Sequence, residues 1–212
     1  MKDYKELIKT FQEDDFTRKR VNLHIHTNNS DGKGDFDNLV EQAEKLNYKY
    51  IAITDHNTMN GYKNSEKACS PVLIPGVEFD VWCGYVFMHL LGYGVDKNNP
   101  ELMKFFAKNK NETEWDIIRL FSTRNIKKLI QAIHSAGGIA VLAHPACCWC
   151  ISMDRFVKKL VSYGLDGIEV YYPYPRFRGI LKFHSVQTVK DIALKYNLIM
   201  TGGTDLHDEI LE

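Results

Sequence analysis

Short apolar runs alternate with amphipathic stretches along most of the chain. Seven runs have the length and the β-branched and aromatic content that are typical of strands. In four stretches between them, apolar residues such as Leu39 and Ala43, or Ile130 and Ile133, recur at helical spacing. Strands that alternate with helices predict parallel βαβ units, in either an open doubly wound sheet or a closed barrel. The runs are Val21–His26, Tyr50–Asp55, Leu73–Phe79, Tyr85–Tyr93, Ile139–His144, Gly167–Tyr171 and Leu198–Thr201.

Two segments fall outside this alternation. Residues 1–20 mix charged and apolar residues, and we expect an N-terminal helical segment there, followed by one domain over 21–212. The polar stretch from Asp96 to Arg124 favours helix and has no strand pattern, so we read about 96–124 as a helical insertion. A cap over a functional site and a plain surface excursion are equally compatible with that pattern. No glycine-rich fingerprint follows the first strand, which weakens the dinucleotide-binding form of a doubly wound sheet.

Composition excludes several classes of protein. The chain has 212 residues, of which 44% are hydrophobic, enough for one domain with a substantial core. Its 27 basic and 27 acidic residues balance, which argues against a polybasic nucleic-acid wrapper or membrane-surface protein, and no duplex nucleic-acid partner is expected. No apolar run approaches the ~18 residues of a membrane span. The odd number of cysteines, five, and the lack of a signal-peptide core predict a reducing, cytoplasmic location.

Residue types that commonly bind metals, His, Asp and Glu, stand at or near the ends of most predicted strands. His24 and His26 lie two apart, so both imidazoles face the same side of the first strand. Functional residues of βα barrels gather at the carboxyl ends of strands, where such side chains meet. A lone His-x-His is weak evidence for a metal site, but the company of the other residues makes a shared site the better interpretation. These residues are His56, Glu78, His89, His144, Asp205 and His207.

The short motifs that contain these residues, taken in their order along the chain, resemble those of the PHP (polymerase and histidinol phosphatase) superfamily of metal-dependent phosphoesterases. The resemblance covers roughly residues 21–207 and implies a distorted (βα)7 barrel, similar to a TIM barrel, with a short helical insertion. It also implies the family's cofactors, two to three divalent metal ions (Mn, Fe or Zn). The motifs are Leu23-His24-Ile25-His26-Thr27, Ser30-Asp31-Gly32, Ile53-Thr54-Asp55-His56-Asn57, Ile74-Pro75-Gly76-Val77-Glu78, His89-Leu90-Leu91-Gly92, Leu142-Ala143-His144-Pro145, Gly167-Ile168-Glu169-Val170 and Gly202-Gly203-Thr204-Asp205-Leu206-His207.

The resemblance also implies how the ligands are grouped. One metal would be held by His24, His26, Glu78 and Asp205, a second by Glu78, His89 and His144, and a third by Asp31, His56 and His207. Asp at position 31, where some relatives have His, resembles the subgroup that hydrolyses nucleoside 3′,5′-bisphosphates and oligonucleotide ends. An oxygen ligand there also tilts the site towards Mn or Fe, whereas imidazoles alone favour Zn. Asp55 is expected to hold a ligand imidazole or to cap the following turn.

Clustered divalent ions determine the expected chemistry. A water bound between metals is acidic enough to supply hydroxide near neutral pH, so no Ser or Cys nucleophile is required. Asp205, Glu78 and His207 are the expected catalytic residues; Asp205 orients the hydroxide, accepts its proton or only binds metal. The leading function is hydrolysis of a phosphate monoester of a nucleotide or small metabolite. Histidinol- or sugar-phosphate phosphatase activity, amidohydrolase chemistry and a non-enzymatic metal-stabilised module are the alternatives.

Substrate contacts are expected after the sixth strand. Arg176 and Arg178 suit a phosphate, and Tyr172 suits a base, although a solvated loop packed on its aromatic residues would look the same. Many relatives have a His where this chain has Pro175-Arg176, and His184 is a weak substitute. Arg119 and Arg124 of the insertion are weaker phosphate candidates. The C-x-x-C of Cys147 and Cys150 has a redox or zinc spacing or forms part of a thiol-rich wall, and His134 is expected to be a surface or core residue.

Overall fold

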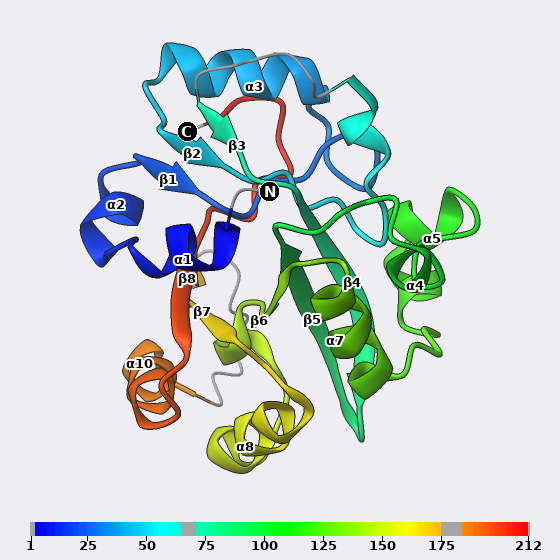
Figure 1. Cartoon of the computed structure of the whole chain (residues 1–212), viewed down its shortest axis with the longest axis vertical. Coiled ribbons are helices and arrows are strands. Elements are labelled where there is room, and N and C mark those ends of the chain that lie inside the picture. Colours follow the sequence, from blue (N-terminus) through cyan, green and yellow to red (C-terminus); the bar gives the residue numbers. More distant parts are fainter. Residues whose placement is uncertain (1–2, 65–70, 175–183, 212) are drawn as a thin grey trace.

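The computed structural model describes residues 3–64, 71–174 and 184–211. Helices cover the outside of a strand-rich centre (Figure 1). Asp35, Asn125, Ser152 and Ser185 each accept a backbone N–H bond at the start of a long helix, which is why these helices begin where they do. The helices are α1 Tyr4–Lys9, α2 Glu13–Thr17, α3 Phe36–Lys45, α4 Pro100–Met103, α5 Asn111–Glu114, α6 Asp116–Arg119, α7 Ile126–Ser135, α8 Met153–Tyr163 and α10 Val186–Lys195, with 3-10 turns η1 Asn60–Asn64 and η2 Pro145–Cys147.

The strands form two sheets among the described residues. One sheet has the parallel order β1-β2-β3 and the other the order β4-β5-β6-β7-β8, in which β4, β5 and β6 are antiparallel neighbours and β6, β7 and β8 are parallel. Isolated bridges link the sheets, from Ile25 to Leu206 and from His56 to Glu78. The strands are β1 Val21–Asn22, β2 Tyr50–Ile51, β3 Val72–Leu73, β4 Gly76–Cys83, β5 Val86–Tyr93, β6 Ile139–Leu142, β7 Gly167–Tyr171 and β8 Ile199–Gly202.

The fold is therefore mixed α/β, as expected, but two details differ from the sequence prediction. The strand ladders of the described residues do not close, so a (βα)7 barrel is not confirmed. The predicted third run divides at Ile74-Pro75 into β3 and β4, because proline lacks the N–H that would continue a ladder. The strands β4 and β5 then form a tight hairpin rather than a βαβ unit, with Gly84 at a φ of 67° in the turn.

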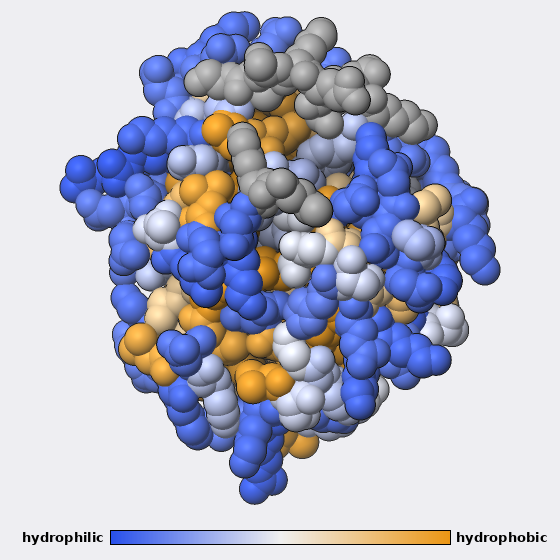
Figure 2. Space-filling model, viewed as in Figure 1, coloured by the Kyte–Doolittle hydropathy of each residue, from blue (hydrophilic) through white to orange (hydrophobic). Residues whose placement is uncertain are grey.

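Two hydrophobic cores hold the layers together. The larger lies between the sheets and the helices α3, α7, α8 and α10. The smaller lies between strands of both sheets and is covered by α1, where Ile8 is fully buried beside Leu23, Leu91 and Val141. In the view of Figure 2, hydrophilic residues lie mainly towards the edges of the face, and hydrophobic residues show between them in its middle. No helix among the described residues has the length and hydropathy of a membrane span.

The insertion consists of three short helices, α4, α5 and α6, which lie beside β4 (Figure 1). It is attached by apolar packing and by hydrogen bonds. Leu102 is buried in the larger core, and the Phe106 ring stacks on Phe79. The Trp82 indole donates to the Leu120 carbonyl at 2.7 Å, and the Ala107 N–H donates to the Asn57 carbonyl at 2.8 Å. The domain limits 1–20, 21–212 and 96–124 stay predictions. The helices α1 and α2 do fall inside the N-terminal segment.

Candidate metal centre

The end of β8 crosses the chain after β1 and brings the ligands of both together. The Asp205 N–H donates to the His24 carbonyl at 2.9 Å, and the His26 N–H donates to the Leu206 carbonyl at 2.9 Å. This approach requires a glycine at 203, since a Cβ there would lie 2.4 Å from the His24 Cβ. On the other side, the Glu78 N–H donates to the Asp55 carbonyl at 3.2 Å, which places β4 against the chain after β2.

Four buried side chains form the first cluster. The Nε2 atoms of His24 and His26 both lie 3.2 Å from Glu78 Oε2. The same two nitrogens lie 3.3 and 3.1 Å from Asp205 Oδ1. All four residues can present one ligand atom to a single metal position.

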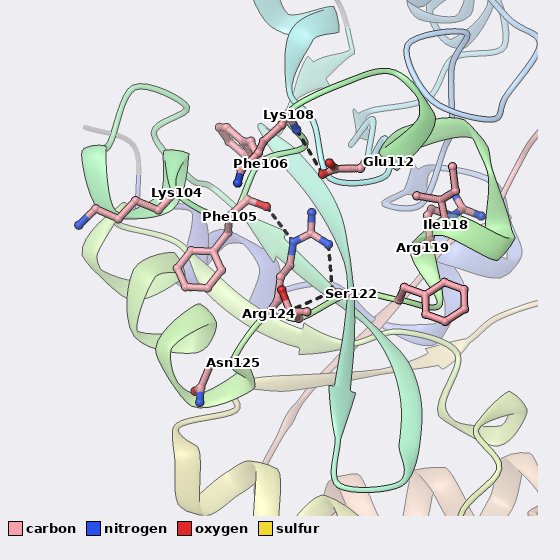
Figure 3. A pocket seen from close by; sticks show the side chains of 12 residues that line it. Lys104, Phe105, Phe106, Lys108, Glu112, Ile118, Arg119, Ser122, Arg124 and Asn125 are labelled. Atoms are coloured by element: carbon pink, nitrogen blue, oxygen red, sulfur yellow. Dashed lines mark hydrogen bonds between the residues drawn. The ribbon is translucent and has the colours of Figure 1, made fainter.

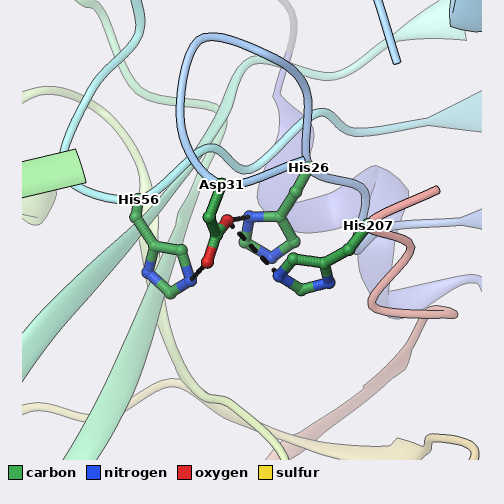
Figure 4. Close-up of side chains that lie close together, drawn as sticks. All are labelled: His26, Asp31, His56 and His207. Atoms are coloured by element: carbon green, nitrogen blue, oxygen red, sulfur yellow. Dashed lines mark ion pairs between the residues drawn. The ribbon is translucent and has the colours of Figure 1, made fainter. Parts of the chain in front are cut away.

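Asp31 is the centre of the second cluster (Figure 4). Its Oδ1 lies 3.6 Å from His26 Nδ1 and 3.3 Å from His207 Nε2, and its Oδ2 lies 3.6 Å from His56 Nε2. The His26 ring stacks between those of His56 and His207, with ring centroids 4.6 and 4.3 Å apart. His26 thus faces the first cluster with one ring nitrogen and the second with the other.

Glu78 joins the first cluster to a third. Its Oε1 lies 3.2 Å from His89 Nδ1 and 3.3 Å from His144 Nε2, and these two ring nitrogens lie 3.2 Å from each other. His56 Nε2 lies 3.4 Å from Glu78 Oε2, and the compact group of possible ligands here is His56, Glu78 and His89. His144 is at the edge of that group. The geometry therefore adds His56 to the expected neighbours of Glu78 and His89.

The chemistry of the donors fits divalent cations. His24 Nε2, both ring nitrogens of His26 and Glu78 Oε2 are buried and have no hydrogen-bond partner. Buried polar atoms without partners are costly, and several that converge on one place indicate a bound ion. Imidazole and carboxylate together suit Mn, Fe or Zn. The residues present can therefore hold metal ions.

Burial and neighbouring charge act in opposite directions on these groups. Burial alone would raise the pKa of Glu78, Asp205 and Asp31, but the surrounding imidazoles hold the pKa of each carboxyl well below its usual range. Burial would lower the pKa of His26 and His89, yet the adjacent carboxylates raise it to about 10. Without a cation these imidazoles hold protons, which a metal has to displace.

Backbone conformation at the site is unusual. His144 has a φ of 27° and Asp205 a φ of 52°, and Asn57, next to His56, has a φ of 56°. Non-glycine residues adopt these angles at an energetic cost, and such residues gather at functional sites. The surrounding hydrogen bonds hold them there: the His144 N–H, for example, donates to Glu169 Oε2 at 2.8 Å.

Two buried carboxylates behind the imidazoles were not assigned from the sequence. Glu169 Oε1 lies 3.0 Å from His24 Nδ1. Asp80 Oδ1 lies 3.3 Å from His56 Nδ1 and 3.2 Å from His89 Nε2. Glu169 belongs to a quoted motif, so its strand position could have suggested this role; no sequence signal pointed to Asp80.

Asp55, expected beside an imidazole or at the following turn, instead holds the loop that carries Asp31. Its Oδ1 accepts from the Thr27 N–H and the Ser30 hydroxyl, each at 2.7 Å. Its Oδ2 accepts from the Thr27 hydroxyl at 2.7 Å. Both expected partners of Asp55 are thus replaced by the chain that follows β1.

The residues predicted to contact substrate are distributed unevenly. Tyr172 reaches the centre, where its hydroxyl donates to Asp205 Oδ2 at 2.6 Å. Arg119 also reaches it, because its Nη1 donates to Asp31 Oδ2 at 2.8 Å. Arg124 instead donates to backbone carbonyls of Phe105 and Asp80. Arg176 and Arg178 lie outside the described residues.

Other candidate residues lie further from the ligands. His184 Nε2 is 2.8 Å from the Cys150 carbonyl oxygen and 3.4 Å from Cys150 Sγ. His134 Nε2 lies 2.7 Å from Asp166 on the surface, as the sequence suggested. Cys147, rather than Cys150, lines a cavity of about 330 Å³ that opens beside His89 and His144. The wall of this cavity also includes Arg119 and Leu120 from the insertion.

An α/β fold with three linked clusters of His, Asp and Glu defines a candidate metal-dependent hydrolase. The PHP domain model matches residues 22–182, and the chain belongs to this family. A 5′-3′ exoribonuclease of Haemophilus influenzae is 32% identical, with 72% of this chain and 79% of the relative covered. A phosphoribosyl 1,2-cyclic phosphate 1,2-diphosphodiesterase of Eggerthella lenta is 23% identical, with 87% and 93% covered. A 3′,5′-nucleoside bisphosphate phosphatase of Chromobacterium violaceum is 30% identical, with 68% and 50% covered.

Solved structures show the same fold. A Bifidobacterium adolescentis protein assigned as a metal-dependent phosphoesterase superposes with a TM-score of 0.74 at 21% identity, covering 89% of this chain and 88% of the other. An amidohydrolase structure from Chromobacterium violaceum, with bound sulfate, has a TM-score of 0.69 at 17% identity and covers 89% and 88%. Family membership and the ligand clusters together make this chain a PHP-family metal-dependent phosphoesterase, and thus a hydrolase.

Proposed function

We propose that the chain holds three divalent ions and hydrolyses a phosphate monoester of a nucleotide or small metabolite. The observation that carries this proposal is the sharing of ligands: His26, His56 and Glu78 each take part in two clusters, so the candidate positions lie side by side. The first metal position lies in the first cluster and takes His24, His26, Glu78 and Asp205. The second position lies in the third cluster and takes Glu78, His89 and His144. The third position lies in the second cluster, around Asp31, and takes Asp31, His56 and His207. Mn, Fe and Zn are the candidate metals.

Ions held here would lower the pKa of a bound water towards neutrality and offset charge on phosphoryl oxygens. The protein's own part is to fix the geometry. Asp205 presents Oδ1 to His24 and His26 while Tyr172 holds its Oδ2, so that this carboxylate has one orientation. Glu78 divides its two oxygens between the first and second positions. We assign Asp205, Glu78 and His207 the catalytic roles.

Arg119, one of the weaker phosphate candidates of the sequence, is the described arginine that reaches the centre, where its Nη1 bonds to Asp31. It lines the cavity beside His89 and His144, and its side chain is 5% exposed. A guanidinium group pairs with phosphate through two parallel hydrogen bonds. Tyr172, Arg176 and Arg178 complete the proposed substrate contacts.

The relatives narrow the substrate class. An oligonucleotide and a nucleoside bisphosphate are implied by two of their names, and a cyclic phosphate diester by the third. We favour nucleoside 3′,5′-bisphosphates and oligonucleotide ends, because the chain has Asp at position 31 and Arg119 donates a hydrogen bond to this carboxylate. Sugar and histidinol phosphates are the runner-up class.

Metal analysis followed by a substrate panel tests the proposal. We expect up to three equivalents of metal after reconstitution with Mn, Fe or Zn. The panel compares nucleoside 3′,5′-bisphosphates, mononucleotides, short oligonucleotides, cyclic phosphates, and sugar and histidinol phosphates. Less than one equivalent of metal would contradict the three-ion centre, and a fully loaded protein that hydrolyses none of these esters would contradict the activity.

A further inference from the structure

Asp80 stands behind two imidazoles of the metal centre, on the side away from Glu78. Its carboxylate is fully buried. His56 turns Nδ1 towards Asp80 and Nε2 towards Glu78, at 3.3 and 3.4 Å. His89 turns Nε2 towards Asp80 and Nδ1 towards Glu78, each at 3.2 Å. Each ring therefore lies between two carboxylates. Ion pairs from Asp80 to His56 Nδ1 and His89 Nε2 would leave the other nitrogen of each ring for a metal.

Asn57 holds Asp80 in this position. The Asn57 amide donates to Asp80 Oδ2, and the Asp80 N–H donates to Asn57 Oδ1 at 3.1 Å. Asn57 directly follows His56 in the chain, so the same short segment supplies both a ligand candidate and the group that orients its partner.

Residues of the insertion form hydrogen bonds with both Asn57 and Asp80. The Ser122 hydroxyl donates to the Asp80 carbonyl at 2.7 Å, and an Arg124 N–H donates to it at 3.3 Å. The Asn57 amide also donates to the Glu112 carbonyl at 2.9 Å. Ser122, Arg124 and Glu112 line one cavity at the outer face of β4 (Figure 3). Hydrogen bonds from α5 and from the segment after α6 thus support Asp80 from outside the sheets.

Arg119 supplies the charge that offsets Asp80. Its Nε lies 3.7 Å from Asp80 Oδ1, and its Nη1 donates to Asp31 Oδ2. A buried carboxylate needs a nearby cation, and this one comes from α6. Through a single side chain, the insertion touches both the orienting group of His56 and His89 and a ligand candidate of the neighbouring cluster.

We propose that Asp80 is the positioning residue for His56 and His89, and that it couples metal binding to the order of residues 105–124. The inference rests on the metal centre proposed above. If the rings bind metal only when Asp80 is held in place, and the insertion holds it, then metal binding must stabilise the insertion in return, because coupling between two sites is reciprocal.

The test compares Asp80→Asn with Asp166→Asn. Asparagine keeps the shape of the side chain and removes its charge. Asp166 is a matched control: it also lies between an imidazole and an ammonium group, His134 and Lys5, each at 2.7 Å, but immediately before β7. The measurements are Mn²⁺ and Zn²⁺ affinity by calorimetry on metal-free protein, and amide hydrogen exchange of residues 105–124 with and without metal.

In the wild-type protein and in Asp166→Asn, we expect metal to slow exchange across 105–124. Asp80→Asn should weaken metal binding by about 10–100-fold, the usual cost of losing a carboxylate behind a ligand imidazole, and should abolish the metal-dependent slowing. Arg119→Lys is the second variant: it keeps the charge but cannot reach both carboxylates, so exchange of 105–124 should rise with a smaller loss of affinity.

Unchanged metal affinity in Asp80→Asn would overturn the positioning role. Equal exchange of 105–124 with and without metal in the wild type would overturn the coupling. If Asp80→Asn does not fold, Arg119→Lys decides. A wild type that binds metal and shows the coupling, but hydrolyses no phosphate ester, would refute the proposed activity and leave this inference standing.

Discussion

Glu169 and Asp80 support the candidate metal centre from opposite sides, and they are held in different ways. Glu169 stands on β7, in the parallel part of the larger sheet, and its two oxygens meet His24 Nδ1 and the His144 N–H. Asp80 stands on β4, in the hairpin, and depends on Asn57 and the insertion. The first carboxylate is fixed by the sheet itself. The second is fixed by hydrogen bonds from Asn57 and from the insertion, so the hairpin side of the centre depends on the insertion being in place.

Glu78 lies between these two sides, and its replacement should have the largest effect. Glu78→Gln keeps the volume but offers one neutral oxygen and an NH2 group that repels a cation. We expect lower metal content and a fall in kcat of at least ~10²-fold, comparable to the loss of one electrostatic stabiliser. Metal analysis and phosphatase rates measure both.

The fold should survive this change, since glutamine keeps the volume of the buried side chain and leaves the apolar residues of both cores unchanged. Thermal melting of metal-free Glu78→Gln against metal-free wild type checks that point. Near wild-type activity together with full metal content would show that Glu78 does not join the two sides. A non-enzymatic module would instead lose thermal stability on metal loss, with no turnover to lose.

Glu169→Gln tests the side of the metal centre that is held by the sheet and does not depend on the insertion. The amide oxygen can still accept the His144 N–H, but the charge opposite His24 Nδ1 is lost. We expect metal affinity to fall by about 10–100-fold. Unlike Asp80→Asn, this variant should keep the metal-dependent slowing of hydrogen exchange in 105–124. Loss of that slowing would mean that the two sides are not separable.

The difference between the two sides also explains what the sequence could predict. His24, His26, Asp205 and His207 follow parallel strands or lie in motifs with fixed spacing, so their positions at the ends of strands predict that they meet. The hairpin broke that logic. β4 and β5 run antiparallel, so His89 lies in the middle of a strand, opposite Asp80 in the register, and not at a carboxyl end.

Contacts across the insertion could not have been predicted from local pattern. Arg119 meets Asp31 over a separation of 88 residues, and nothing in the apolar spacing of Asp96 to Arg124 indicates which side chain turns inward. Asp80 lies between apolar neighbours and reads as a strand residue with one polar side chain. The partners of Asp80 become visible only in the structure, where the register of β4 and β5 places it opposite His89 and where Asn57 forms hydrogen bonds with it.

Tyr172→Phe should have a smaller effect than either carboxylate change. The variant removes the hydroxyl that donates to Asp205 Oδ2 and leaves the ring against His144, whose centroid is 5.2 Å away. A hydrogen bond to a charged group contributes about 1.5–3 kcal/mol, and we expect the lower end, or roughly a tenfold loss. A fall in kcat supports an orienting role for Tyr172, whereas a rise in KM alone supports the substrate contact predicted from the sequence.

The smallest effect expected is a pH dependence in the thermal stability that is lost when metal is removed. In the metal-free protein, the pKa values of His26 and His89 are about 10, raised from 6.5 by neighbouring carboxylates. The folded state then binds more protons than the unfolded state between those values. The resulting stabilisation is fully present below pH 6.5 and is lost as pH rises towards 10.

Metal-bound imidazoles are already deprotonated, so the loaded protein lacks this dependence. The Tm difference between loaded and chelator-treated protein should therefore widen as pH rises from 6.5, by about 2–4 °C for each kcal/mol lost. Calorimetric scans at several pH values measure it, with Glu78→Gln as the variant in which the gap should shrink. A gap that narrows with rising pH would mean that protons on His26 and His89 do not stand in for the metals, and that both sides of the centre are held together by other contacts.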